Sequence, residues 1–123
     1  MNNMNPLAIE KLADTKGVIA VTEFSRKGML ANFAGSFSED EFSLMAGMCA
    51  SITILIEMQG RLLADFTTDA DWDRCQGWVL WGADISLITM YDTVSVVRSQ
   101  DVSFNALITE ISAISDRSYQ QQD

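Results

Sequence analysis

The chain has 123 residues, a length that suits one domain with its own hydrophobic core. Its net charge of −9 at pH 7 argues against nucleic acid as a partner, because the phosphates would be repelled. With 48% apolar residues it is neither a disordered chain nor a disulfide mini-protein. We expect residues 1–123 to form a single domain, with frayed ends at 1–5 and 116–123.

The first predicted elements are a short helix and a β-hairpin. Asn5 can cap the helix with Pro6 at its first position, and Gly17 is placed to end it. The β-rich segments Val18–Phe24 and Met29–Phe33 follow. A polar loop that contains a glycine joins them, which is typical of a hairpin.

The stretch from Phe37 to Gln59 is predicted to be the central helix. Ser38 and Glu41 have the spacing of a capping box, and the two phenylalanines that flank the box have the spacing of a hydrophobic staple. The uncharged run Ser43–Ile56 is shorter than the roughly 20 residues that cross a bilayer, so we expect a buried helix. The β-branched run ITILI leaves a strand as the alternative, and the helix can extend past Gly60 at a cost.

This helix has two faces without charge. Because an α-helix turns by about 100° per residue, its large apolar side chains share one wide arc: Phe42, Leu44, Met45, Met48, Cys49, Ile52, Leu55 and Ile56. The opposite side carries mostly small residues: Ser43, Ala46, Gly47, Ala50, Ser51, Thr53 and Ile54, with Met58 near the end. Such a helix needs cover on two sides. We expect the large arc to pack on a sheet and the small-residue side to pack on a partner subunit.

The second half of the chain is richer in strands. The polar segment Thr67–Gln76 is expected to be an irregular connection with one helical turn. Three short β segments follow, Gly77–Trp81, Ile85–Met90 and Thr93–Arg98, and a meander is the economical arrangement.

The last helix has the clearest periodicity. Asp101 or Ser103 can cap it, and its apolar residues follow the i, i+3, i+4, i+7 rule: Phe104, Leu107, Ile108, Ile111 and Ile114. The predicted order is therefore α-β-β-α-β-β-β-α. Five antiparallel strands with helices on the faces of the sheet make an α+β domain.

Three segments carry a resemblance to a known family: GVIAVTEFSRKGMLANFAG, MAGMCASITILIEMQG, and GWVLWGADISLITMYDTVSVV followed by FNALI. Over about Leu7 to Ile114 the chain resembles the roadblock/dynein light chain superfamily, and within it a bacterial family of uncharacterised small proteins. The resemblance implies a roadblock/profilin-like fold, a five-stranded sheet with the long helix on one face. It also implies homodimers in which long helices pair and sheets join edge to edge through the third strand.

The dimer interface expected from the helix pattern and the resemblance has two parts. The residues are Ser43, Gly47, Ala50, Ser51 and Ile54 of the central helix, and Trp78, Val79, Leu80 and Trp81 of the third strand. Relatives act as scaffolds or regulators for small GTPases and motors, and the bacterial group is often associated with sulfur-oxidation genes.

The residues give little sign of catalysis. There is no histidine, which removes Ser-His-Asp and Cys-His arrangements and any zinc site built on imidazole. No glycine precedes a lysine, so there is no P-loop, and no GxGxxG motif occurs. We expect a non-enzyme without cofactor or metal.

Two polar features next to the third strand still need an interpretation. Asp69, Asp71 and Asp73 alternate as at the start of a calcium loop, but Arg74 stands where glycine is required, so we expect a solvated acidic loop. Cys75 neighbours that arginine and is a candidate reactive thiol, whereas Cys49 is expected to be a reduced core residue. The three tryptophans near this strand favour an interface or core over a ligand cage.

The leading functional hypothesis is a non-catalytic homodimeric scaffold or regulatory subunit. Its expected partners are a second copy and a small GTPase or a redox or sulfur-metabolism protein, without nucleic acid or membrane. The alternative is a small-ligand or sulfur-relay accessory protein that uses Cys75. The N-terminal stretch lacks the pattern of a signal peptide and no CxxC motif occurs, so we expect a cytoplasmic location.

Neither calcium nor GTP is expected to raise the melting temperature, because a ligand stabilises a fold only if the folded state binds it. Differential scanning fluorimetry across a concentration series of each ligand measures this. A reproducible, concentration-dependent rise with either ligand would contradict the interpretation of the acidic loop or of the missing P-loop.

Overall fold

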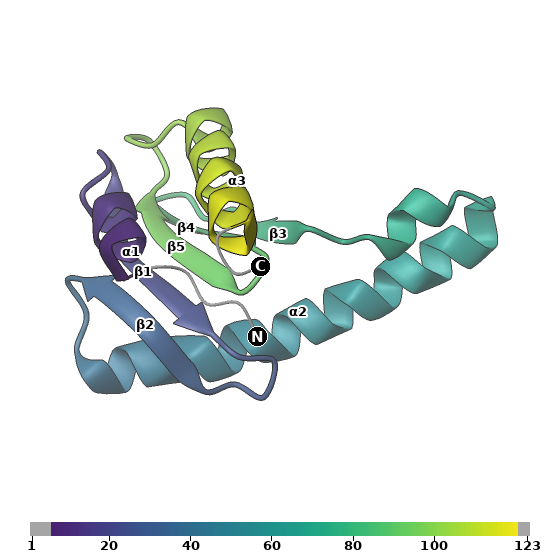
Figure 1. Ribbon diagram of the computed structural model, residues 1–123, viewed down its shortest axis with the longest axis horizontal. Helices are drawn as coiled ribbons and strands as arrows, with labels where there is room; N and C mark the ends of the chain where they lie inside the picture. Colours follow the sequence, from purple (N-terminus) through teal and green to yellow (C-terminus); the bar gives the residue numbers. More distant parts are fainter. Residues whose placement is uncertain (1–5, 121–123) are drawn as a thin grey trace.

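Two apolar clusters, one on each face of a five-stranded antiparallel sheet, hold the fold together. The computed structural model describes residues 6–120. The long helix α2 (Glu39–Thr67) lies on one face of the sheet, and α1 (Pro6–Ala13) and α3 (Phe104–Gln120) lie on the other (Figure 1). The α+β fold and the predicted order of elements are confirmed.

The sheet has the strand order β2-β1-β5-β4-β3, so β2 and β3 are its edges. The bounds are β1 (Val18–Phe24), β2 (Leu30–Gly35), β3 (Gly77–Leu80), β4 (Ile85–Met90) and β5 (Thr93–Arg98). The predicted hairpin of β1 with β2 and the meander from β3 to β5 are both present. β2 begins and ends later than expected, and β3 ends one residue earlier.

The start of α2 is fixed by its own sequence. The backbone N–H of Ser38 donates to Glu41 Oε1 (2.9 Å), and the N–H of Glu41 donates to Ser38 Oγ (3.2 Å). The rings of Phe37 and Phe42 lie 5.5 Å apart, as in a hydrophobic staple. The helix then continues for 29 residues to a left-handed C-cap at Thr68, so the strand alternative for ITILI is wrong.

The expected orientation of α2 is wrong. Its small-residue side supplies much of the contact with the sheet, where Ala46, Ala50 and Thr53 are buried together with Phe42 and Cys49. Large side chains that we expected in the core are exposed instead: Leu44, Met48 and Leu55. Small side chains allow a helix to approach a sheet closely, and this contact outweighs the burial of a larger arc.

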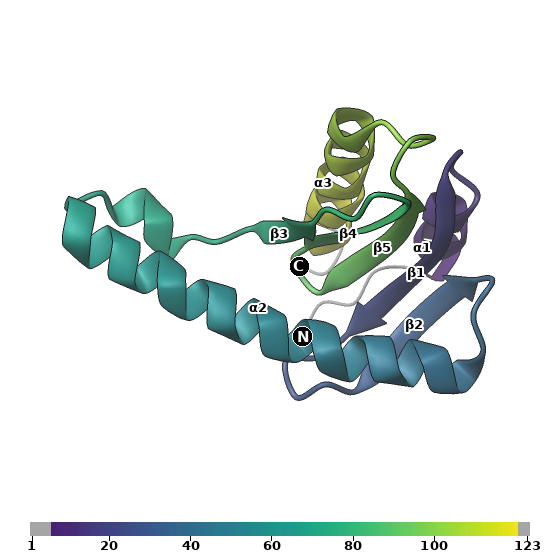
Figure 2. The same ribbon diagram turned by 180° about the vertical axis from the view of Figure 1, so that it is seen from behind.

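The far end of α2 leaves the sheet and stands away from the rest of the molecule (Figure 2). A single 3₁₀ turn, η1 (Ala70–Asp73), folds back against it. We call residues 58–76 the arm. Gly60 is buried in the arm, where the carbonyl oxygen of Trp72 lies so close that a β-carbon at this position would collide with it.

Within residues 6–120, α2 is also the one helix long and apolar enough to cross a membrane, by length and composition only. Part of its apolar surface is used within the fold, because Phe42 and Cys49 are buried against the sheet.

The last helix extends to Gln120, past the end expected near Asp116. Ile111 is fully buried in the cluster with Ile9 and Leu12, as its spacing predicts. Fraying was expected at 1–5 and 116–123, but residues 116–120 belong to α3, while residues 1–5, which include Asn5, and 121–123 lie outside the described residues, as does the side chain of Ile114.

Ile111→Asp is expected to unfold the domain or leave it insoluble. A lone buried carboxylate costs several kcal/mol, a large share of a typical stability of about 5–15 kcal/mol. Thermal unfolding followed by circular dichroism measures the effect. Asn105→Asp places the same charge at an exposed position of α3 and should melt close to the wild type. Cooperative melting of Ile111→Asp near the wild-type temperature would contradict the assigned core.

Candidate functional site

A band of exposed large apolar side chains runs along α2 on the side away from the sheet. We call it the α2 band, and it consists of Leu44, Met48, Leu55, Met58, Leu62 and Phe66. The exposed fraction reaches 75% at Leu44 and 89% at Phe66. The steps between them are of four, seven, three, four and four residues, which keep one row of the helix as in a helix-pairing seam. Contiguous exposed apolar surface of this kind marks an interaction site in a soluble protein.

The second exposed apolar surface is the edge strand β3. It pairs with β4 on one side, and Val79, Leu80 and Trp81 are exposed, with Trp81 70% accessible. The ring of Trp81 stacks on Phe104 with centroids 4.6 Å apart. An exposed apolar edge strand is an aggregation hazard unless something covers it.

The elements that carry these two surfaces, α2 and β3, are joined by a side-chain hydrogen bond. Trp78, the first apolar residue of β3, turns its ring toward α2, and its Nε1–H donates to Thr53 Oγ1 (2.9 Å). This bond holds β3 beside the middle of α2, two residues before Leu55 of the α2 band.

The helix residues of the expected interface need one correction. Ser43, Ser51 and Ile54 are exposed, as an interface requires. Ala50 is only 3% exposed and packs against the sheet, so it cannot face a partner. The α2 band was missed, although its heptad spacing was visible in the sequence.

Gly47, the remaining residue of the expected helix interface, is involved in a contact within the chain. The loop between β1 and β2 crosses α2 there, and a β-carbon at Gly28 would lie 3.3 Å from the Cα of Gly47. Gly28 has a φ of +84°, which favours glycine. The same loop carries Arg26, whose guanidinium forms a bidentate ion pair with Glu57, with Nη1 3.2 Å from Oε2. The Glu57 carboxylate raises the pKa of Arg26.

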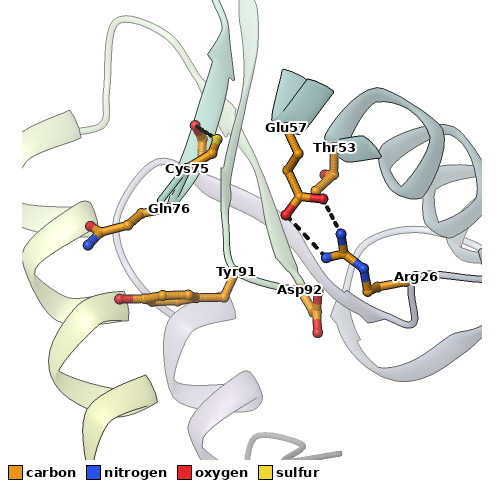
Figure 3. A pocket seen from close by; sticks show the side chains of 8 residues that line it. Arg26, Thr53, Glu57, Cys75, Gln76, Tyr91 and Asp92 are labelled. Carbon is orange, nitrogen blue, oxygen red and sulfur yellow. Dashed lines mark hydrogen bonds and ion pairs between the residues drawn. The ribbon is translucent and has the colours of Figure 1, made fainter. Parts of the chain in front are cut away.

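A polar cavity of about 200 Å³ lies beside this ion pair. Figure 3 shows Arg26 and Glu57 pointing toward each other, with Asp92 on the neighbouring β4–β5 turn and Cys75 on the segment before β3. Burial raises the pKa of Asp92, and Arg26 opposes this effect. Tyr91, which precedes Asp92, has a φ of 56°, uncommon for a residue other than glycine.

The two cysteines differ as expected in burial. Cys49 is free and buried, and burial raises the pKa of its thiol to about 12, so it stays protonated and inert at neutral pH. Cys75 is free and half-buried, and its Sγ lies 3.5 Å from the carbonyl oxygen of Gly77. A redox or sulfur-relay role for Cys75 stays a prediction.

The alternating aspartates form the turn η1. Asp69 is its N-cap, and its carboxylate accepts the backbone N–H of Asp71 (3.0 Å). Across the part of the chain that the structure describes, no three acidic or sulfur-bearing side chains are grouped so that they could hold a metal ion. Asp69 starts η1, which lies between the end of α2 and β3.

Asp92→Asn is expected to stabilise the fold slightly at pH 7, because the amide removes a charge that burial disfavours. The folded pKa of Asp92 is raised above its ordinary value of 3.8, so its contribution to stability falls as the pH rises from about 4 through the folded pKa. Urea unfolding should show the gain at pH 7 and no difference at pH 3. Asp84→Asn, at an exposed position, is the matched control. A destabilised variant at pH 7 would mean that attraction to Arg26 outweighs the cost of burial.

Comparison with known proteins places the chain in a family. The family model described as "Uncharacterized conserved protein (DUF2173)" matches residues 8–113. A search of curated proteins finds no match.

Solved structures share the fold at low sequence identity. A Roadblock/LC7 domain from Streptomyces avermitilis is 14% identical with a TM-score of 0.72, covering 98% of this chain and 100% of that chain. Myxococcus xanthus MglB is 16% identical with a TM-score of 0.72, covering 90% and 88%. A structure described as MglB with tetrameric arrangement is 15% identical with a TM-score of 0.67, covering 91% and 79%. The chain has the roadblock/LC7 fold and belongs to the uncharacterised conserved protein family DUF2173.

Proposed function

We propose that the protein is a non-catalytic, homodimeric scaffold or regulatory subunit of roadblock type. The observation that carries this proposal is the exposed α2 band, and the edge strand β3 is a second exposed apolar surface. A twofold-related copy covers both surfaces at once. One of the matched structures, MglB with tetrameric arrangement, is a relative in fold that self-associates.

The α2 band is symmetric about Leu55. Met48 lies seven residues before it and Leu62 seven after it, while Leu44 and Phe66 lie eleven before and eleven after. Two antiparallel copies related by a twofold axis at Leu55 therefore set apolar residues against apolar residues along the whole band. Leu55 meets its own equivalent, as an isologous contact requires.

The edge strand is also self-complementary about one residue. Trp78 faces α2 and Trp81 faces α3, so the residues of β3 alternate between the two faces of the sheet. An axis at Val79 pairs Gly77 of one copy with Trp81 of the other, so a large ring covers a residue without a side chain. The bond from Trp78 to Thr53 places this level of β3 within two residues of Leu55 on α2.

For a partner other than a second copy, the proposal is a small GTPase, on the strength of the roadblock resemblance. The chain has no P-loop of its own, so it would act on the GTPase and not as one. The described residues offer no feature that favours a sulfur-metabolism protein instead.

The wild type is expected to have twice the monomer mass of 13.6 kDa in light scattering at micromolar concentration. Leu55→Asp should be monomeric, because the two carboxylates would meet at the axis. Leu7→Asp, on an exposed leucine outside the band, is the matched control and should remain dimeric. A wild-type mass of one monomer would contradict the proposal.

Cross-linking tests the antiparallel register separately. In a Cys75→Ser background, Leu55→Cys should form a disulfide between two copies under mild oxidation, since equivalent residues meet at the axis. Leu44→Cys alone should not cross-link. Capture from native lysate by wild type but not by Leu55→Asp, followed by mass spectrometry, then tests whether a GTPase needs the dimer.

A further inference from the structure

The helical limb of the arm carries the last three residues of the α2 band, Met58, Leu62 and Phe66, but the band does not require a second limb folded back on the helix. α2 extends beyond the Arg26–Glu57 ion pair, and η1 folds back along it (Figures 1 and 2). Gly60 lets the carbonyl oxygen of Trp72 approach the helix closely. The two limbs of the arm are therefore held together by a backbone contact.

A cavity of about 510 Å³ lies between the two limbs. Its helical wall is made by Ile56, Gly60 and Leu63, and Trp72 is on the opposite limb. Leu63 and Trp72 are partly exposed at 40% and 50%. A cavity of this size can take one or two large side chains, and apolar walls with a few polar groups are typical of binding pockets.

Pairing along the α2 band leaves the helical wall of this cavity uncovered, whereas Gly77, at the other end of the cavity, belongs to the edge strand β3 that the proposed dimer also uses. Ile56, Gly60 and Leu63 form a row of their own, at steps of four and three, on the side of α2 that faces η1. The band residues follow a different row of the helix, on the side away from the sheet.

The segment 61–74, which supplies part of the lining of the cavity, carries a net negative charge. Residues 61–74 carry four carboxylates, Asp65, Asp69, Asp71 and Asp73, against the two guanidiniums of Arg61 and Arg74. None of the four carboxylates forms a salt bridge with a described basic residue. Asp71 itself lines the cavity, where Arg74 also lies.

A second copy of this chain is a poor occupant. Its 17 acidic residues outnumber its 8 lysines and arginines. The local basic pair is Arg26 and Lys27, and Arg26 is bound to Glu57. The net charge of residues 61–74 is complementary to a positively charged partner, which would also be steered toward the arm over a distance.

We propose that the arm is a docking site for a basic segment of a partner protein, in which one apolar side chain enters the cavity and flanking lysines or arginines meet the aspartates. This site goes beyond the scaffold function and does not depend on the dimer. Docking of this kind combines an apolar anchor in a pocket with charges at its rim.

The test uses the full ¹⁵N-labelled chain and three capped peptides as probes. Lys-Lys-Leu-Lys-Lys should shift amide signals of residues 56–77. Lys-Lys-Ser-Lys-Lys, which lacks the anchor, should bind more weakly, and Glu-Glu-Leu-Glu-Glu should not bind. Equal binding of the serine and leucine peptides, or shifts outside residues 56–77, would overturn the proposal.

Charge variants of the protein give a second measurement. Asp71→Asn with Asp73→Asn should weaken binding of Lys-Lys-Leu-Lys-Lys by roughly threefold to tenfold. Asp14→Asn with Asp84→Asn removes the same charge from distant exposed positions and should leave binding unchanged. Equal losses in the two double variants would reduce the effect to net charge and overturn the site. Light scattering on the same samples reports the dimer independently, so the two proposals fail separately.

Discussion

Close contact between α2 and the sheet requires small side chains where the two meet. Ala46 and Ala50 supply them on the helix, and Ala20 lies in the same cluster on the sheet. Once this side is buried, the larger side chains of α2 must point away from the core. The exposed band follows from how the domain packs, so the fold exposes the proposed interaction surface in the same step as it forms its core.

Further contacts fix α2 along its length. The capping box sets where it begins, the crossing of Gly28 over Gly47 sets its distance from the β1–β2 loop, and the bond to Trp78 sets its level beside the edge strand. These contacts are local to the subunit. The arrangement of the band and of β3 is therefore formed before any partner arrives, which lowers the entropy cost of association.

The fold could be predicted because its signals are local. Caps, turn residues and periodicity identify each helix and strand from a few neighbouring residues. The orientation of α2 could not be predicted in this way, because both of its sides lack charge and hydrophobicity alone favours burying the larger one. For the candidate site, Val79, Leu80 and Trp81 are exposed but their role in an interface stays a prediction, Ala50 is buried against the sheet, and Leu55, expected in the core, is exposed. The role of Gly60 was missed because the contact it permits, with Trp72, joins separate elements of the chain.

The ion pair between Arg26 and Glu57 has a mechanical consequence. It holds α2 close to the point where the helix passes the end of the sheet. From there Thr67 is ten residues away, about 15 Å along an unbroken helix. A tilt of about 10° at the ion pair displaces the tip by roughly 3 Å. The helix thus acts as a lever with its fulcrum at Glu57, and a force on the tip is transmitted to the β1–β2 loop, which carries Arg26.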